Sequence, residues 1–305
     1  MNHPKTLRLA AIAAACATLL AACGGGGDDG PKTVALEFAA VAGSTPVKCG
    51  TEVTSLGSGN VNAQVKDFRF YVSNVQMLKA DGSKVALTLP ANDDWNYTKD
   101  GQAITLVDLE DGTGSCSGGT AATNAVIRGT VPAGDYVGFE ATMGVPFALN
   151  HTDTTSAPKP MDIAAMAWSW QAGRKFAKIE VTDPQGATGT WLSKTFNVHL
   201  GSTGCTGNPA SGQTVSCTAA NRMAFRLGSF DPAVQKVAVD LRALLASNDI
   251  TVNQAGATGC MSGGTDPECL GVFSALAIDW KADGTGTGQP VNGGQSQTLF
   301  RAVAK

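Results

Sequence analysis

The chain has 305 residues, of which 15% are charged, 6% are aromatic and 37 are glycine. Globular chains usually carry about 25% charged residues and about 7% glycine, so this composition excludes a coiled coil, a charge-rich disordered chain and a typical helical bundle. The formal net charge is −3, and it becomes −5 if an N-terminal signal with two basic residues is removed. Because nucleic-acid binding requires clustered Lys and Arg, we expect no nucleic-acid partner.

The N-terminal segment reads as a secretory signal. Lys5 and Arg8 precede an apolar stretch from Leu9 to Leu20. This stretch is too short to span a bilayer of about 30 Å as a stable helix, so it is interpreted as the apolar part of a signal peptide.

The signal ends in a possible lipidation site. Leu20-Ala-Ala-Cys23 resembles a bacterial lipobox, in which the cysteine is acylated after cleavage. We expect a lipoprotein signal peptide over residues 1–22, lipidation of Cys23 and a Gly-rich tether over residues 23–32. The implied location is the periplasm-facing cell envelope, with an outer-membrane lipid anchor as the only membrane contact. The alternative is an ordinary signal peptide with an incidental cysteine.

Six further cysteines predict disulfides, because cysteines of exported proteins are usually oxidised. Six thiols allow about 15 connectivities, which the sequence alone does not resolve. Loop length favours the local pairs Cys205–Cys217 and Cys260–Cys269, which leaves Cys49 with Cys116. A thiolate metal site is the rival hypothesis, but the chain has no Cys-x-x-Cys motif.

Apolar and polar residues alternate along most of the chain, as in half-buried strands. The first strand contains Val34, Leu36 and Phe38. Phe68 and Phe70 lie on an apolar face with a polar face opposite, and a change of parity predicts a β-bulge near Ser73-Asn74. Asp81-Gly82 predicts a hairpin turn. Further strands are predicted over 85–89, 103–109, 125–131, 136–143, 175–181, 191–200, 222–227 and 235–241, and short helices over 160–166 and 241–247.

No strand alternates with a long helix, so a parallel α/β sheet is not expected. We predict an all-β fold: one antiparallel β-sandwich-like domain over residues 33–305, with long loops and disulfides.

The mature chain has only two histidines, His151 and His199, and Trp168 and Trp170 lie between them in the sequence. In isolation each histidine is typical of a solvated surface residue and each tryptophan of a core residue. Imidazole is nevertheless a common copper and zinc ligand, and two imidazoles need a third group. The candidates for that group are Asp153, Met161, Asp162, Met166 or water. No Cys-loop-His-loop-Met spacing of a blue-copper site is present.

Four segments carry a family resemblance: Asp67-Phe-Arg-Phe-Tyr-Val-Ser-Asn74, Val145-Pro-Phe-Ala-Leu-Asn-His151, Trp168-Ser-Trp-Gln-Ala-Gly-Arg-Lys-Phe176 and His199-Leu-Gly-Ser-Thr-Gly-Cys205. The sequence resembles the methanobactin-associated periplasmic copper-binding family, also called metallo-mystery pair four-Cys motif proteins, from about Val34 to Phe300. The resemblance implies a non-enzymatic copper-binding protein.

The resemblance also implies the ligands. Family members bind copper through histidines and a kynurenine, which a di-haem c-type cytochrome peroxidase-like partner makes from a tryptophan. The matching positions are His151, His199 and either Trp168 or Trp170. The implied role is copper acquisition or homeostasis, and the rival hypothesis is a metal-free envelope lipoprotein with a structural or adhesion role.

The sequence departs from the family pattern in three ways. Ala167 replaces an aromatic residue, Arg174 replaces a tyrosine and adds a positive charge near the expected site, and six cysteines exceed the four of the family name. The acidic residues Asp108, Glu110 and Asp111 are expected to be solvated loop residues rather than a carboxylate site.

Overall fold

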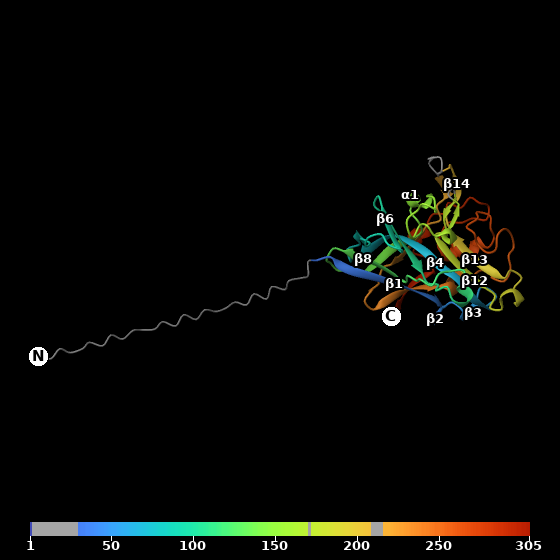
Figure 1. Cartoon of the computed structure of the whole chain (residues 1–305), viewed down its shortest axis with the longest axis horizontal. Helices are drawn as coiled ribbons and strands as arrows, with labels where there is room; N and C mark the ends of the chain where they lie inside the picture. The colour runs from blue at the N-terminus through green and yellow to red at the C-terminus, as the bar shows by residue number, and fades with distance from the viewer. Residues whose placement is uncertain (2–29, 170–171, 209–215) are drawn as a thin grey trace.

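The computed structural model describes residue 1 and residues 30–169, 172–208 and 216–305. Its strands form two main sheets and two two-stranded ribbons (Figure 1). The nine-stranded sheet contains β3 (Glu52–Leu56), β4 (Val61–Leu78), β5 (Lys84–Ala86), β6 (Asn96–Lys99), β7 (Gln102–Asp108), β9 (Gly138–Met143), β12 (Ala177–Thr182), β13 (Thr195–Leu200) and β16 (Met223–Leu227). The five-stranded sheet contains β1 (Lys32–Ala42), β2 (Thr45–Pro46), β8 (Val126–Val131), β17 (Gln235–Asp240) and β18 (Phe300–Ala304). The ribbons are β10 (Ala167–Ser169) with β11 (Gly173–Arg174), and β14 (Thr203–Thr206) with β15 (Ser216–Ala219).

The predicted all-β, sandwich-like fold is confirmed, with one difference in strand direction. β1 pairs with β17 in parallel, through Phe38 opposite Val237, whereas the other named strand pairs are antiparallel. Alternation within a strand reports which residues face the core but not the direction of the neighbouring strand, so the sequence pattern did not reveal this pair.

The helices are short. They are α1 (Phe147–Asn150), α2 (Leu241–Leu245) and α3 (Cys269–Ala275), with 3-10 turns η1 (Gly114–Cys116), η2 (Ala164–Met166), η3 (Gly186–Thr188) and η5 (Val291–Gly294). α2 lies within the range predicted for a helix, and its N-cap is Asp240, whose carboxylate accepts from the backbone amides of Arg242 and Ala243. Within the described residues, no helix has the length and apolar character needed to cross a membrane.

The helix predicted over 160–166 was wrong except for the short turn η2. The carbonyl oxygen of Met161 accepts a hydrogen bond of 2.8 Å from the Arg174 guanidinium. The Arg174 side chain therefore occupies a carbonyl oxygen that a helix would need for its own backbone hydrogen bonds.

A cluster of phenylalanine rings fills the space between the two main sheets. Phe38 and Phe300 come from the smaller sheet, and Phe70 from the larger one contacts both, with ring centroids 5.7 Å from each. Phe225 lies 4.2 Å from Phe300 by the same measure. These rings, all 2% exposed or less, form the apolar contact that makes the two sheets one core.

β4 is the central strand of the larger sheet and pairs with five others. Its register shifts between Ser73 and Gln76, and Asn74 has a φ of 52°. The bulge predicted near Ser73-Asn74 is thus confirmed.

The polar face of β4 is buried rather than solvated. Asp67 and Arg69 are 1% and 2% exposed, and they form a salt bridge with each other. On the neighbouring strand β12, Lys178 lies opposite Arg69 and pairs with Asp67. These paired charges therefore form a buried layer on the face of β4 opposite Phe68 and Phe70.

Two acidic residues expected to be solvated belong to this layer. Asp108 is 2% exposed and lies opposite Arg69 in the register of β7 with β4, and Glu110 is fully buried, 3.9 Å from the Arg69 guanidinium. Burial raises the pKa of Asp108 to about 8, and the neighbouring Glu110 adds to this effect. The expectation for these two residues was wrong because the cation that they face comes from a strand about forty residues earlier in the chain.

We predict that Arg69→Met lowers the free energy of unfolding by about 3–5 kcal/mol, because it leaves buried carboxylates without their cation. Lys66→Met is the matched control: the Lys66 side chain is 44% exposed and lies 3.8 Å from Glu180, so we expect a loss below about 1 kcal/mol. Urea denaturation measures both. Equal losses in the two variants would show that the buried layer does not depend on Arg69.

We also predict a pH effect from Asp108. An ordinary aspartate has a pKa of about 3.9. The pKa of Asp108 is about 8 in the folded chain, so between about pH 4 and pH 8 the folded state holds a proton that the unfolded state has released. The free energy of unfolding therefore falls as the pH rises through this range. Asp108→Asn should flatten this fall in denaturation curves recorded from pH 5 to pH 8, whereas Asp94→Asn, on the surface, should leave it unchanged. An identical slope in Asp108→Asn would contradict the assignment.

Candidate metal centre

His199 lies on β13, beside the buried charged layer. It is opposite Lys178 in the register with β12, and it is 7% exposed. Its Nε2 atom lies 2.7 Å from Oε1 of Glu180. Burial alone would raise the pKa of Glu180, but hydrogen bonds from His199 and Lys178 lower it to about 2. Glu180 is therefore an ionised acceptor.

The tautomer of His199 follows from this contact. Nε2 must carry a proton to donate to the carboxylate. Burial lowers the pKa of His199, although Glu180 opposes that effect, so the neutral imidazole has its lone pair on Nδ1. A histidine whose second nitrogen donates to a carboxylate is the usual arrangement of a metal ligand.

His151 follows α1 directly and is 8% exposed. Its Nε2 atom lies 3.1 Å from Nδ2 of Asn150. The orientation of that amide is fixed, because its Oδ1 accepts from the backbone N–H of Arg174 at 2.8 Å. Nδ2 is then the donor, so Nε2 of His151 is the acceptor of this hydrogen bond, which a metal bound at Nε2 would displace.

A disulfide lies beside His151. Cys205 and Cys217 face each other across the β14–β15 ribbon and are bonded, and Nε2 of His151 is 3.5 Å from Sγ of Cys217. Figure 1 shows α1 and β14 next to each other at one end of the molecule. The structure has the two local disulfides that loop length favoured and the remaining pair, Cys49–Cys116.

Trp168 lies on β10, against the chain segment that follows His199. A Cβ atom placed on Gly201 would be 2.4 Å from Cζ3 of Trp168, so only glycine permits this contact. Trp168 is partly buried and, with Cys205 and Met261, lines an open cavity of about 390 Å³. Trp170, the other candidate, lies outside the described residues, as does Cys23.

Arg174 links the loop around His151 to the tryptophan ribbon. Its side chain is 1% exposed and donates to the backbone carbonyls of Asn150, Thr152 and Met161. Burial lowers the pKa of this guanidinium. The positive charge of Arg174, which was expected to lie near a metal, is thus hydrogen-bonded to backbone carbonyl oxygens.

The two histidines have separate immediate partners. Among the described residues, His151 forms a close group of potential ligand atoms with Cys205 and Cys217, and His199 belongs to no such group of three. Both histidines are buried, so the solvated-surface interpretation is wrong for them. Of the proposed third ligands, Met161 and Met166 are core residues, and Asp162 has a buried Oδ1 atom with no hydrogen-bond partner.

Comparison with known proteins decides the family. A family model described as MbnP matches residues 31–262. This chain belongs to the MbnP family. Among solved structures, MbnP from Methylosinus trichosporium matches with a TM-score of 0.78 and 35% sequence identity, covering 90% of this chain and 99% of that chain. A comparison with curated proteins finds no match. The family resemblance predicted from the sequence is therefore confirmed.

Two polar residues near the histidines were missed in this MbnP-family chain. Glu180 and Asn150 set the tautomers of His199 and His151. Asn150 precedes His151 within a segment that the resemblance already included, so its position was a usable signal. Glu180 had no such signal, because only the register of β12 with β13 brings it to His199.

We predict that Arg174→Ala lowers the free energy of unfolding by about 2–3 kcal/mol, because buried carbonyls lose their donor. Hydrogen exchange should also rise across residues 147–163. Arg222→Ala is a suitable control: Arg222 packs near Gly144 in the segment before α1, and it is partly exposed. If both variants exchange like the unmodified protein over 147–163, Arg174 does not hold this loop.

Proposed function

We propose that this protein is a periplasm-facing, lipid-anchored copper-binding protein. The proposed ligands are the imidazole of His151, Nδ1 of His199 and a kynurenine formed from Trp168 or Trp170 by a di-haem peroxidase-like partner. In this proposal the protein is the substrate of that enzyme and acts in copper acquisition or homeostasis.

One observation carries the proposal: the Trp168 ribbon lies between the segments of the two histidines. Arg174 on this ribbon donates its backbone N–H to Asn150, next to His151. Its carbonyl oxygen would be 2.8 Å from a Cβ atom on Gly201, two residues after His199. Its partner across the ribbon is Ala167, which precedes Trp168.

The donor chemistry fits copper. Imidazole suits copper, and both proposed histidines lie in the described, buried part of the chain. The indole nitrogen of tryptophan is a poor ligand, whereas kynurenine offers an aniline nitrogen and a carbonyl oxygen. Burial of both imidazoles would limit the access of water and competing ligands to the metal.

Glu180 provides a sharp test. Because it orients His199, Glu180→Gln should weaken copper binding by about 10–100-fold, and His199→Ala should weaken it at least as much. Glu140→Gln is the matched control, since Glu140 pairs with Lys84 at the surface of the same sheet. Copper titration against a chromophoric competitor measures the affinities. A metal-free structural protein would show no difference among these variants.

The tryptophan assignment is tested by peptide mass mapping of protein co-produced with the di-haem partner. We expect the peptide with Trp168 and Trp170 to lose one carbon and gain one oxygen. The change should vanish in Trp168→Phe or in Trp170→Phe, whichever residue is modified, and persist in Trp191→Phe, a buried control tryptophan. Intact tryptophan in the presence of the active partner would contradict the kynurenine ligand.

A further inference from the structure

The Cys205–Cys217 disulfide is the only disulfide in the described residues that lies within ligand distance of a histidine. The Sγ atoms and an imidazole nitrogen of His151 all lie within 4.8 Å of one another. The ribbon geometry holds both cysteines directly opposite each other, so the two sulfur atoms need little backbone movement to share one ion.

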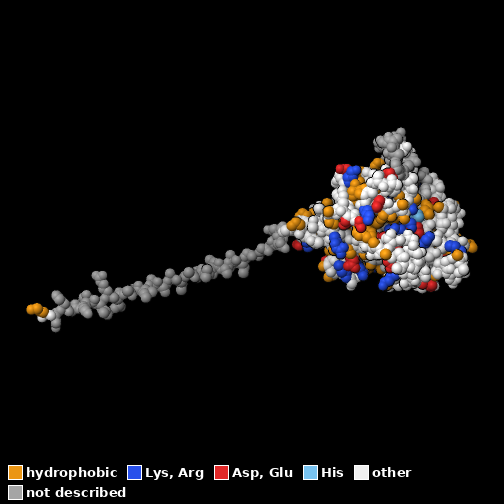
Figure 2. All heavy atoms as spheres, in the orientation of Figure 1, with side chains coloured by type: hydrophobic (Ala, Val, Ile, Leu, Met, Phe, Trp, Pro, Cys, Tyr) orange, Lys and Arg blue, Asp and Glu red, His pale blue; other side chains and the backbone are white. Residues whose placement is uncertain are grey.

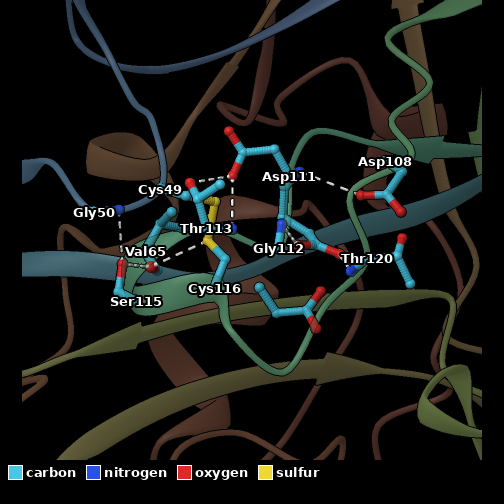
Figure 3. Close-up of a disulfide and its surroundings, with 12 residues drawn as sticks. Cys49, Gly50, Val65, Asp108, Asp111, Gly112, Thr113, Ser115, Cys116 and Thr120 are labelled. Atoms are coloured by element: carbon cyan, nitrogen blue, oxygen red, sulfur yellow. Dashed lines mark hydrogen bonds between the residues drawn. A yellow bond between two sulfur atoms is a disulfide. The ribbon is translucent and has the colours of Figure 1, made fainter.

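The other two disulfides differ in this respect. Cys49–Cys116 lies near Glu110, but that carboxylate already accepts from the backbone amides of Gly112 and Thr120, each at 2.8 Å. Figure 3 shows this disulfide together with Gly112 and Thr120. Cys260 and Cys269 are 1% and 0% exposed, and no third ligand of the described chain joins them. Both disulfides therefore have the surroundings of structural cross-links.

The Cys205–Cys217 disulfide is also accessible. Both cysteines are partly exposed. Cys205 lines the cavity of about 390 Å³ beside Trp168, and Cys217 lines a second cavity of about 310 Å³ beside Phe147. A small thiol or a metal complex thus has an approach to either sulfur.

We infer that this disulfide is a redox-controlled metal site: once reduced, Cys205, Cys217 and His151 bind a Cu(I) ion. Two thiolates and one imidazole form a soft donor set, which suits monovalent copper. The site shares His151 with the copper site proposed above, but it needs neither His199 nor a kynurenine.

The reduction is a thiol–disulfide exchange with a dithiol. One thiolate of the dithiol attacks Sγ of Cys205, the bond between the protein sulfurs breaks, and Cys217 leaves as a thiolate beside His151. The second thiol of the dithiol then displaces Cys205, so the dithiol ends as a disulfide and the protein gains two electrons and two protons. Binding of Cu(I) to both sulfurs releases these two protons to water.

Limited anaerobic reduction tests accessibility. After treatment with dithiothreitol, iodoacetamide and peptide mapping, we expect Cys205 and Cys217 to be alkylated before the other cysteines. Alkylation of another pair first would overturn the accessibility argument.

Cu(I) titration of the reduced protein, freed of dithiothreitol, tests the site itself. Against a bicinchoninate competitor we expect one bound Cu(I) ion with ultraviolet thiolate-to-copper absorption, which the oxidised protein lacks. Reduced protein that has been alkylated at both cysteines, and the variant Cys205→Ser/Cys217→Ser, should lack this thiolate-bound ion. His151→Ala should bind it at least about tenfold more weakly. Cys260→Ser/Cys269→Ser, the matched control, should retain it.

His199→Ala separates this inference from the proposed function. That variant should lose copper binding in the oxidised protein and still gain one Cu(I) on reduction. No thiolate-bound Cu(I) in the reduced, unmodified protein, or an equal amount of it in Cys205→Ser/Cys217→Ser, would overturn the redox site and leave the His199 site untouched.

Discussion

The orientation of His199 depends on the buried charge pairs of the larger sheet. Arg69, Asp67, Lys178 and Glu180 lie on adjacent strands and are all largely buried. Buried charges of this kind are tolerated only when each has a partner. His199 is at the end of this row, so its orientation depends on the sheet register as well as on its own loop contacts.

A second constraint comes from Arg174. One buried guanidinium and one backbone amide of the same residue fix the loop before and after His151. The two histidines are therefore positioned in different ways: His199 by the sheet, and His151 by a loop that hydrogen bonds hold in place. Charges on the face shown in Figure 2 are mixed in sign, whereas the charges of the buried network are paired with one another.

The alternation of Phe68 and Phe70 with polar residues was enough to predict a strand, and the change of parity after Val72 was enough to predict its bulge. The fold class followed from many such patterns. The burial of Asp108 and the contact of Glu180 with His199 were not predictable from such patterns, because both depend on which strands become neighbours. The two histidines and the tryptophans between them stood out in the sequence, and the family resemblance assigned their roles. The tautomers of the histidines came only from the structure.

The parallel pairing of β1 with β17 has a consequence for how the chain reaches its native state. The backbone amide of Gly43 donates to Asp240 across 197 residues of sequence, and β18 completes the same sheet at the C-terminus. A chain synthesised from its N-terminus thus keeps the β17 edge of β1 unpaired until nearly all of it has been made. Contacts of such long range close slowly, so this sheet is completed only at the end of folding.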